Sequence, residues 1–154
     1  MGTFTVTSAD TLTLKDRVFT DFADDDVTQI TFPNDAVTMK TGKNRNTIYA
    51  KNETGNNANL VLRLVRGSAD DQFMQAELAK MEQDFVSMGL FKGEFVKRIG
   101  NGEEGANNVV RDVYTLLGGV IVRRVDGKEN LSGDTSQAVS VYNMTFAQAQ
   151  RIIQ

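Results

Sequence analysis

Only one stretch of this chain repeats its apolar residues at helical spacing, and this constrains the fold more than any other feature. Five apolar residues recur at spacings of four, three, four and three, which places them on one stripe of a helix: Met74, Leu78, Met81, Phe85 and Met88. Ser68 precedes the stripe as an N-cap, with Asp71 three residues later, and Gly89 follows it as a left-handed C-cap. The sequence therefore predicts one helix from Ser68 to Met88. We assign the first four stripe residues to the core, because core packing is the more frequent role at this spacing.

The rest of the chain favours strands, since polar and apolar residues alternate there at period two. We expect strands at 12–19 (one strand or a bent pair), 27–32, 37–41, 47–50, 60–65, 91–99, 109–125 and 136–146. Residues 60–65 are apolar on both faces apart from Arg63, which predicts a central strand covered on both sides. Gly118 and Gly119 predict a bulge or bend, and Asp126-Gly127 a hairpin turn. The tail 147–154 is compatible with a short helix or an extended arm.

These elements predict a mainly β (α+β) fold. Its architecture is an antiparallel β-sandwich or barrel-like domain with one packed α-helix. The 154 residues fit a single domain, 1–154, with 40% hydrophobic and 24% charged residues.

The chain contains no Cys and no His, and this excludes several kinds of chemistry. Disulfides, thiolate nucleophiles, Ser-His-Asp triads and imidazole metal sites are impossible without those residues. The acidic run 21–26 lacks the ligand spacing of an EF-hand, so we expect a solvated turn. Glu103-Glu104 and the glycine pairs match no catalytic or phosphate-binding motif. We therefore expect no enzyme activity, and we assign no catalytic residue, metal or cofactor.

Charge and hydropathy limit the partners. The net charge is -3 and no polybasic tract is present, which disfavours tight nucleic-acid binding. The basic pairs Lys97-Arg98 and Arg123-Arg124 are expected on an outer strand face or at a subunit interface. No apolar run is long enough for a spanning helix, and residues 1–14 do not resemble a signal peptide.

Self-association is the role that a domain of this kind favours. Residues 41–59 are rich in Asn and Gly, which indicates a long exposed hairpin or loop around a short strand. Open sheet edges are either blunted or used to pair with another copy of the chain. Subunits that add their sheets edge to edge around a closed axis form a ring with a continuous barrel.

The order of features resembles the tail tube proteins of contractile-tailed bacteriophages, in the branch of short tube proteins of Mu-like and related myophages. It consists of polar N-terminal strands, the hairpin around Thr47-Ile48-Tyr49, the apolar strand 60–65, Ser68-Ala69-Asp70-Asp71 leading into the helix, and a closing strand 139–146. That family is similar in fold to the haemolysin-coregulated protein of type VI secretion and to pyocin tubes.

The resemblance implies a structural virion protein that forms hexameric rings, stacked into a hollow tail tube inside a contractile sheath. The implied partners are other copies of the chain and the sheath, tape-measure and baseplate proteins. DNA would pass through the lumen without specific binding. The implied place is the virion tail, assembled in the host cytoplasm. Alternatives are the tube of a type VI secretion or pyocin-like particle, another tail ring component such as a terminator or baseplate ring, and an enzyme or small-ligand binder.

Loop length and polarity suggest which residues would serve such a tube. A lumen that lets DNA slide should be polar or mildly acidic with few unpaired cations. We expect four lumen-facing residues: Gln29, Thr31, Thr38 and Lys40. Ring stacking is assigned to the N-terminal residues, the tail from Ala147, and eight loop residues: Lys43, Asn44, Arg45, Asn46, Asn52, Glu53, Asn56 and Asn57.

Overall fold

The computed structural model describes residues 2–6, 11–23, 28–127, 129 and 131–154. Its strands are β1 (Thr5–Val6), β2 (Thr11–Leu14), β3 (Arg17–Phe19), β4 (Thr28–Thr31), β5 (Val37–Thr41), β6 (Thr47–Lys51), β7 (Ala58–Val65), β8 (Phe91–Gly100), β9 (Val109–Arg123) and β10 (Val139–Ile153). The helix α1 spans Ala69–Gln83, and short 3-10 turns η1 (Ala106–Asn108) and η2 (Thr135–Ala138) precede β9 and β10. Val27 and the acidic residues 24–26, for which a strand start and a turn were predicted, lie outside the described residues.

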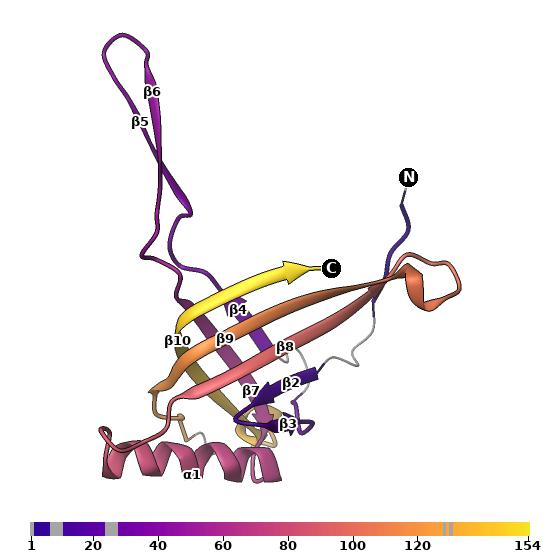
Figure 1. Ribbon diagram of the computed structural model, residues 1–154. Coiled ribbons are helices and arrows are strands. Elements are labelled where there is room, and N and C mark those ends of the chain that lie inside the picture. The colour runs from indigo at the N-terminus through magenta and orange to yellow at the C-terminus, as the bar shows by residue number, and fades with distance from the viewer. Residues whose placement is uncertain (1, 7–10, 24–27, 128, 130) are drawn as a thin grey trace.

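One eight-stranded sheet has the order β3-β2-β8-β9-β10-β7-β4, with β1 paired to β8, and its strand pairings among the described residues are antiparallel. β7 and β4 pass behind β8, β9 and β10 at a steep angle, and α1 lies across one end of the sheet (Figure 1). Strands β5 and β6 form a separate two-stranded hairpin. The predicted mainly β (α+β) class is confirmed.

Strand β10 joins the two parts of the bent sheet. Its residues 139–146 pair with β7, whereas residues 143–153 pair with β9, and the register shifts between Asn143 and Met144. A register shift of this kind adds local twist and bends a strand. The strand therefore starts at Val139, later than predicted, and the tail 147–153 continues it as an extended segment.

The hydrophobic core lies between the inner face of this sheet and α1. Its members come from nearly every strand and from the helix: Leu12, Leu14, Phe19, Leu60, Leu62, Leu64, Met74, Leu78, Phe91, Phe95, Leu116, Ile121, Tyr142, Met144 and Phe146. In β7, alternate residues from Ala58 to Leu64 are buried, while the residues between them are exposed or half-buried. The expectation that both faces of this strand are covered is therefore wrong, because within one subunit only the inner face has a core to pack on.

The predicted bend at Gly118-Gly119 is confirmed as a bulge within the continuous strand β9. Phe91 of β8 lies opposite Gly119, but Gly93 lies opposite Leu116, so β9 has one extra residue here. Gly118 has a φ of 67°, which a residue with a side chain rarely adopts. A Cβ on Gly119 would lie 2.3 Å from the ring of Phe146. Both glycines are therefore required by the local geometry.

The helix ends five residues earlier than predicted. Ser68 caps it as expected, accepting from the Asp71 N–H at 3.3 Å, but the C-cap is Asp84 and Gly89 plays no part in it. The Asp84 carboxylate accepts from the N–H groups of Val86 and Ser87, which offers the chain an alternative to helical hydrogen bonds.

Three of the four predicted core residues of the helix contact the core. Met74 and Leu78 are buried, and Met81 is half-buried against the same cluster. The assignment of Phe85 to the core is wrong, since its side chain lies beyond the helix and is 62% exposed.

Of two turns between strands, one agrees with the prediction and one does not. The pair β2–β3 is the predicted bent pair, joined by Lys15 and Asp16, which both have positive φ as in a tight I′ hairpin turn. The Asp126-Gly127 hairpin prediction is wrong, because these residues belong to a longer connection between β9 and η2.

Candidate assembly surfaces

The β5–β6 hairpin projects away from the sheet (Figure 1). Its cross-strand pairs run from Val37 opposite Lys51 to Thr41 opposite Thr47, and every residue of both strands is exposed. A two-stranded hairpin on its own is marginally stable in water. The hairpin is therefore an exposed unit that pairs with no strand of the main sheet.

One face of the hairpin carries an apolar group, with Lys51 at its base and Thr41 and Thr47 toward the tip. Met39 lies directly opposite Tyr49, and the two side chains are 62% and 70% exposed, with Val37 next along the same face. On the other face Ile48 is exposed beside Lys40. Clustered exposed apolar side chains of this size are typical of an interaction site.

The hairpin is also basic. Between Asp35 and Glu53 the sequence has no acidic residue, but it has four cations: Lys40, Lys43, Arg45 and Lys51. Within the described part of the chain, none of these four makes a hydrogen bond or ion pair through its side chain. The hairpin therefore carries uncompensated positive charge as well as apolar surface.

The residues assigned to ring stacking divide into two groups. Residues 43–46 form the exposed tip, where the Gly42 N–H donates to the Asn46 carbonyl. Asn52, Asn56 and Asn57 lie at the base and Glu53 is exposed beside them.

The base is held by hydrogen bonds within the chain. The Asn52 side chain donates to the Asp35 carbonyl and accepts from the Gly55 N–H, while the Asn34 amide donates to the Asn57 side chain. The Asn56 carbonyl accepts from the Ala149 N–H of β10. Asn52 and Asn57 therefore hold the base of the hairpin by hydrogen bonds, a role that composition alone did not reveal.

The C-terminal half of β10 is an open sheet edge. Residues 148–153 pair with β9 on one side, and β7 ends its pairing at Phe146 on the other. In the described chain the one backbone bond on that open side joins the Ala149 N–H to Asn56. A strand edge of this length is a template for pairing with another chain.

The four residues expected to face a lumen do not share one surface. Gln29 and Thr31 are exposed on edge strand β4 and alternate with half-buried Thr28 and Ile30, as the period-two pattern predicted. Thr38 and Lys40 lie on the projecting hairpin, away from β4 (Figure 1). The four residues are divided between two parts of the molecule, because the chain leaves the sheet after β4 and enters the hairpin.

The outer face of the sheet carries exposed cations on two neighbouring strands. Arg98 and Arg111 lie directly opposite each other on β8 and β9, both exposed, and neither has an ion-pair partner among the described residues. Like charges directly opposite on a sheet are destabilising. The basic pair Lys97-Arg98 is divided between the two faces, since Lys97 lies opposite the buried Asp112.

Three carboxylates of α1 are buried, and all three have partners that explain them structurally. Asp70 accepts from the Arg17 Nε at 2.9 Å and from the N–H groups of Thr20 and Asp21 at 2.8 Å each. Asp71 accepts from the Tyr142 hydroxyl and from the Gly67 N–H. These groups fasten the first turn of the helix to β3 and β10.

Glu77, the third buried carboxylate, pairs with Lys15 at 2.6 Å. Burial alone would raise the pKa of Glu77, but the hydrogen bonds and charges of Lys15 and Lys80 outweigh it and lower the pKa. The pKa of Tyr142 is raised well above its usual range by burial and by the neighbouring Asp71 carboxylate.

Among the described residues, no cluster of three or more acidic side chains is arranged to hold a metal ion. No helix there has the length and apolar character needed to cross a membrane. Glu103 and Glu104 lie on an exposed turn between β8 and η1. Neither carboxylate makes an ion pair with another described residue.

Comparison with known proteins shows which solved structures share this fold. No family model matches the sequence, and no curated protein matches it. Among solved structures, a chain of the anti-feeding prophage cap, the tube-terminating cap, has a TM-score of 0.58 at 11% identity, covering 97% of this chain and 92% of that one. A chain of the six-fold symmetrised anti-feeding prophage baseplate has a TM-score of 0.52 at 13% identity, covering 99% and 93%. This chain therefore shares its fold with subunits found in those two assemblies.

Proposed function

We propose that this chain is a structural subunit of a phage-like contractile tail, that it forms rings, and that stacked rings make the inner tube. The fold likeness covers nearly the whole of both chains, and both neighbours come from assemblies of many subunits around a tube or a baseplate. The ring number that we propose is six, supported by the six-fold symmetry of the baseplate structure. The subunit acts by assembly, without catalysis or a bound cofactor.

The observation that carries this proposal is that the subunit is incomplete on its own. Among the described residues, the β10 edge beyond Phe146 pairs with no strand on its open side, and every residue of strands β5 and β6 is exposed. Pairing of the β10 edge with a neighbouring sheet would extend the sheet around a closed axis, while the hairpin would reach other subunits. The partners we propose besides other copies are sheath, tape-measure and baseplate proteins. The place we propose is the virion tail, assembled in the host cytoplasm.

A second candidate is a ring that stays single, as a tube-terminating cap or a baseplate ring. The two structural neighbours favour it, since one belongs to a tube-terminating cap and the other to a baseplate. The tube of a secretion or pyocin-like particle would have the same subunit geometry.

Negative-stain electron microscopy of the purified chain at high concentration tests both candidates. Long hollow rods support the tube, and isolated rings support the cap or baseplate ring. Light scattering that finds only monomers at every concentration would overturn both.

A further inference from the structure

We propose that the β5–β6 hairpin of one copy docks on a second copy, against the flank formed by β1 and the loop 101–105. This inference deepens the proposed function by naming the partner surface of the hairpin. It concerns a contact between two copies, so it is measured separately from tube formation.

The proposed flank has the chemistry that the hairpin lacks. Phe4 and Val6 are 74% and 61% exposed, and Glu103 and Glu104 are exposed on the adjacent loop. Between Gly100 and Val110 the sequence contains these two acids and no cation. The flank therefore offers apolar and acidic surface where the hairpin offers apolar and basic surface.

These flank residues form one surface in the fold. Thr5 lies opposite Gly100 in the β1–β8 pairing, which brings the N-terminal segment beside the start of the loop. A Cβ on Gly102 would lie 3.8 Å from the side chain of Thr3. The backbone at Phe4, between Thr3 and Thr5, therefore runs beside the loop that carries Glu103 and Glu104.

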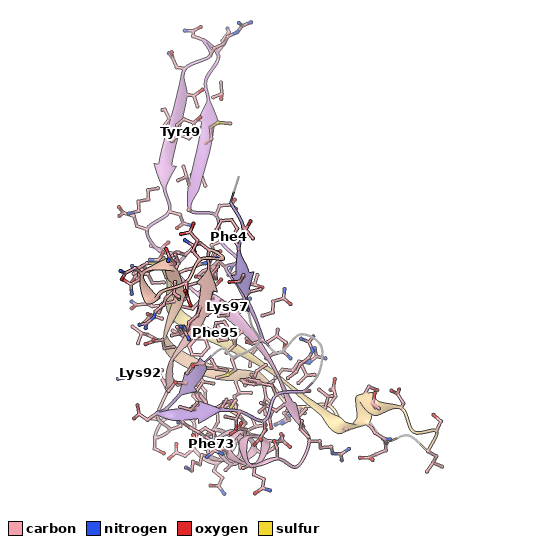
Figure 2. The ribbon with its side chains drawn as sticks, turned by 90° about the vertical axis from the view of Figure 1, so that its right-hand side faces the viewer. Phe4, Tyr49, Phe73, Lys92, Phe95 and Lys97 are labelled. Carbon is pink, nitrogen blue, oxygen red and sulfur yellow. The ribbon has the colours of Figure 1, made fainter. Side chains whose placement is uncertain are left out.

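The hairpin and the flank lie at one end of the molecule but on opposite sides of the sheet. The hairpin leaves from β4 and β7, the last strands of the sheet order, whereas β1 pairs with β8 beyond β9 and β10. Figure 1 shows the hairpin and the 101–108 loop rising on opposite sides, and Figure 2 shows Tyr49 and Phe4 toward the same end. The two surfaces are different patches, so their contact is heterologous and can repeat around a ring.

A second copy fits the hairpin better than a polyanion does. Met39 and Tyr49 present apolar surface that phosphate groups cannot cover, while Phe4 and Val6 can. The charges of Lys43 and Arg45 on one copy and of Glu103 and Glu104 on the other then set orientation and exclude wrong pairings.

Cross-linking tests the contact cleanly, because the chain has no Cys of its own. Thr47→Cys and Thr3→Cys are prepared as separate variants, because these exposed residues lie near Tyr49 and Phe4 in the sequence and leave both apolar side chains in place. They are mixed at assembly concentration and treated with a short bismaleimide. The matched control mixes Thr47→Cys with Val86→Cys, whose site after α1 is 94% exposed. We expect at least about tenfold more mixed dimer from the first mixture, since a held contact raises the effective concentration of the two thiols.

Charge reversal provides the second arm. Lys43→Glu with Arg45→Glu, or Glu103→Lys with Glu104→Lys, should abolish the excess cross-linking in the Thr47→Cys and Thr3→Cys backgrounds. All four substitutions together should restore it, because the charges again match. Circular dichroism confirms that each variant is folded.

The outcomes separate this inference from the proposed function. Tubes that form without excess mixed dimer overturn the docking and leave the tube standing. Mixed dimer without tubes supports the docking and counts against the tube. Heparin binding that depends on Lys43 and Arg45, with no excess mixed dimer, would show that the hairpin partner is a polyanion and overturn the inference.

Discussion

The Tyr142 hydroxyl of β10 donates to the Asp71 carboxylate in the first turn of α1, across 71 residues of sequence. Both residues are buried, and Asp71 also accepts from the Gly67 N–H that precedes the helix. One carboxylate thus joins the last strand, the helix and its N-terminal turn. This junction holds α1 in place together with the bonds of Asp70 to Arg17 and of Glu77 to Lys15.

Removal of the hydroxyl should destabilise the subunit. Tyr142→Phe keeps the ring but leaves the buried Asp71 oxygen without its donor, which costs about 1–3 kcal/mol. Urea denaturation followed by circular dichroism measures the free energy of unfolding. Tyr49→Phe is the matched control, because the Tyr49 ring lies on the exposed hairpin. An equal loss in both variants would show that the Asp71 bond contributes nothing specific.

Acid should weaken the attachment of the helix to the β2–β3 turn. Burial alone would raise the folded-state pKa of Glu77, but the hydrogen bonds and charges of Lys15 and Lys80 outweigh burial and lower this pKa. A carboxyl with a lowered folded pKa binds fewer protons in the folded state than in the unfolded state, so its contribution is present above the unfolded pKa of about 4.3. That contribution is lost as the pH falls through the folded pKa.

The variant Glu77→Gln removes the carboxylate and so isolates its contribution to the free energy of unfolding. We expect the stability difference between wild type and Glu77→Gln to be largest near neutral pH and to shrink below about pH 4, by urea titrations at several pH values. Glu53→Gln, on the exposed hairpin base, serves as the control. A difference that stays constant down to pH 2 would assign the effect of the substitution to packing.

The bulge in β9 should tolerate no side chain at Gly119. Its Cβ would meet three ring atoms of Phe146 at 2.3 to 2.9 Å, and that ring is fully buried and cannot move aside. Overpacking of this kind costs about 1–3 kcal/mol, so Gly119→Ala should lower the thermal midpoint by several degrees. Gly127→Ala is the control, since nothing lies within 4 Å of a Cβ there. Equal midpoints for the two variants would contradict the close contact.

The sequence predicted those parts of the fold that depend on local pattern. The helix start at Ser68, the bulge at Gly118-Gly119 and the alternation of Gln29 with Ile30 follow from capping, backbone freedom and period two. The end of the helix was missed because Asp84 captures the next amide groups, a local competition that apolar spacing does not reveal.

The assembly surfaces were predicted less well, because they depend on contacts far apart in the chain. The Asn-rich segment indicated a hairpin, but not that Asn52 and Asn57 are used at its base. The opposed pair Arg98 and Arg111 required the β8–β9 register, since the two residues lie 13 positions apart in the sequence. Periodicity assigned Phe85 to the core, and only the tertiary structure places it outside.

The apolar hairpin face should matter for assembly but not for subunit stability. Met39 and Tyr49 contact no core residue of their own subunit, so Met39→Ser with Tyr49→Ser should change the free energy of unfolding by less than about 0.5 kcal/mol. The same variant should lose rods or rings in the electron microscope, because the buried apolar area between copies drives association. Thr38→Ser with Ala50→Ser, on the opposite hairpin face, should leave assembly intact. Assembly of the Met39 and Tyr49 variant at the wild-type concentration would show that the apolar face is not an interface, whereas a loss of subunit stability would show that it packs within its own chain.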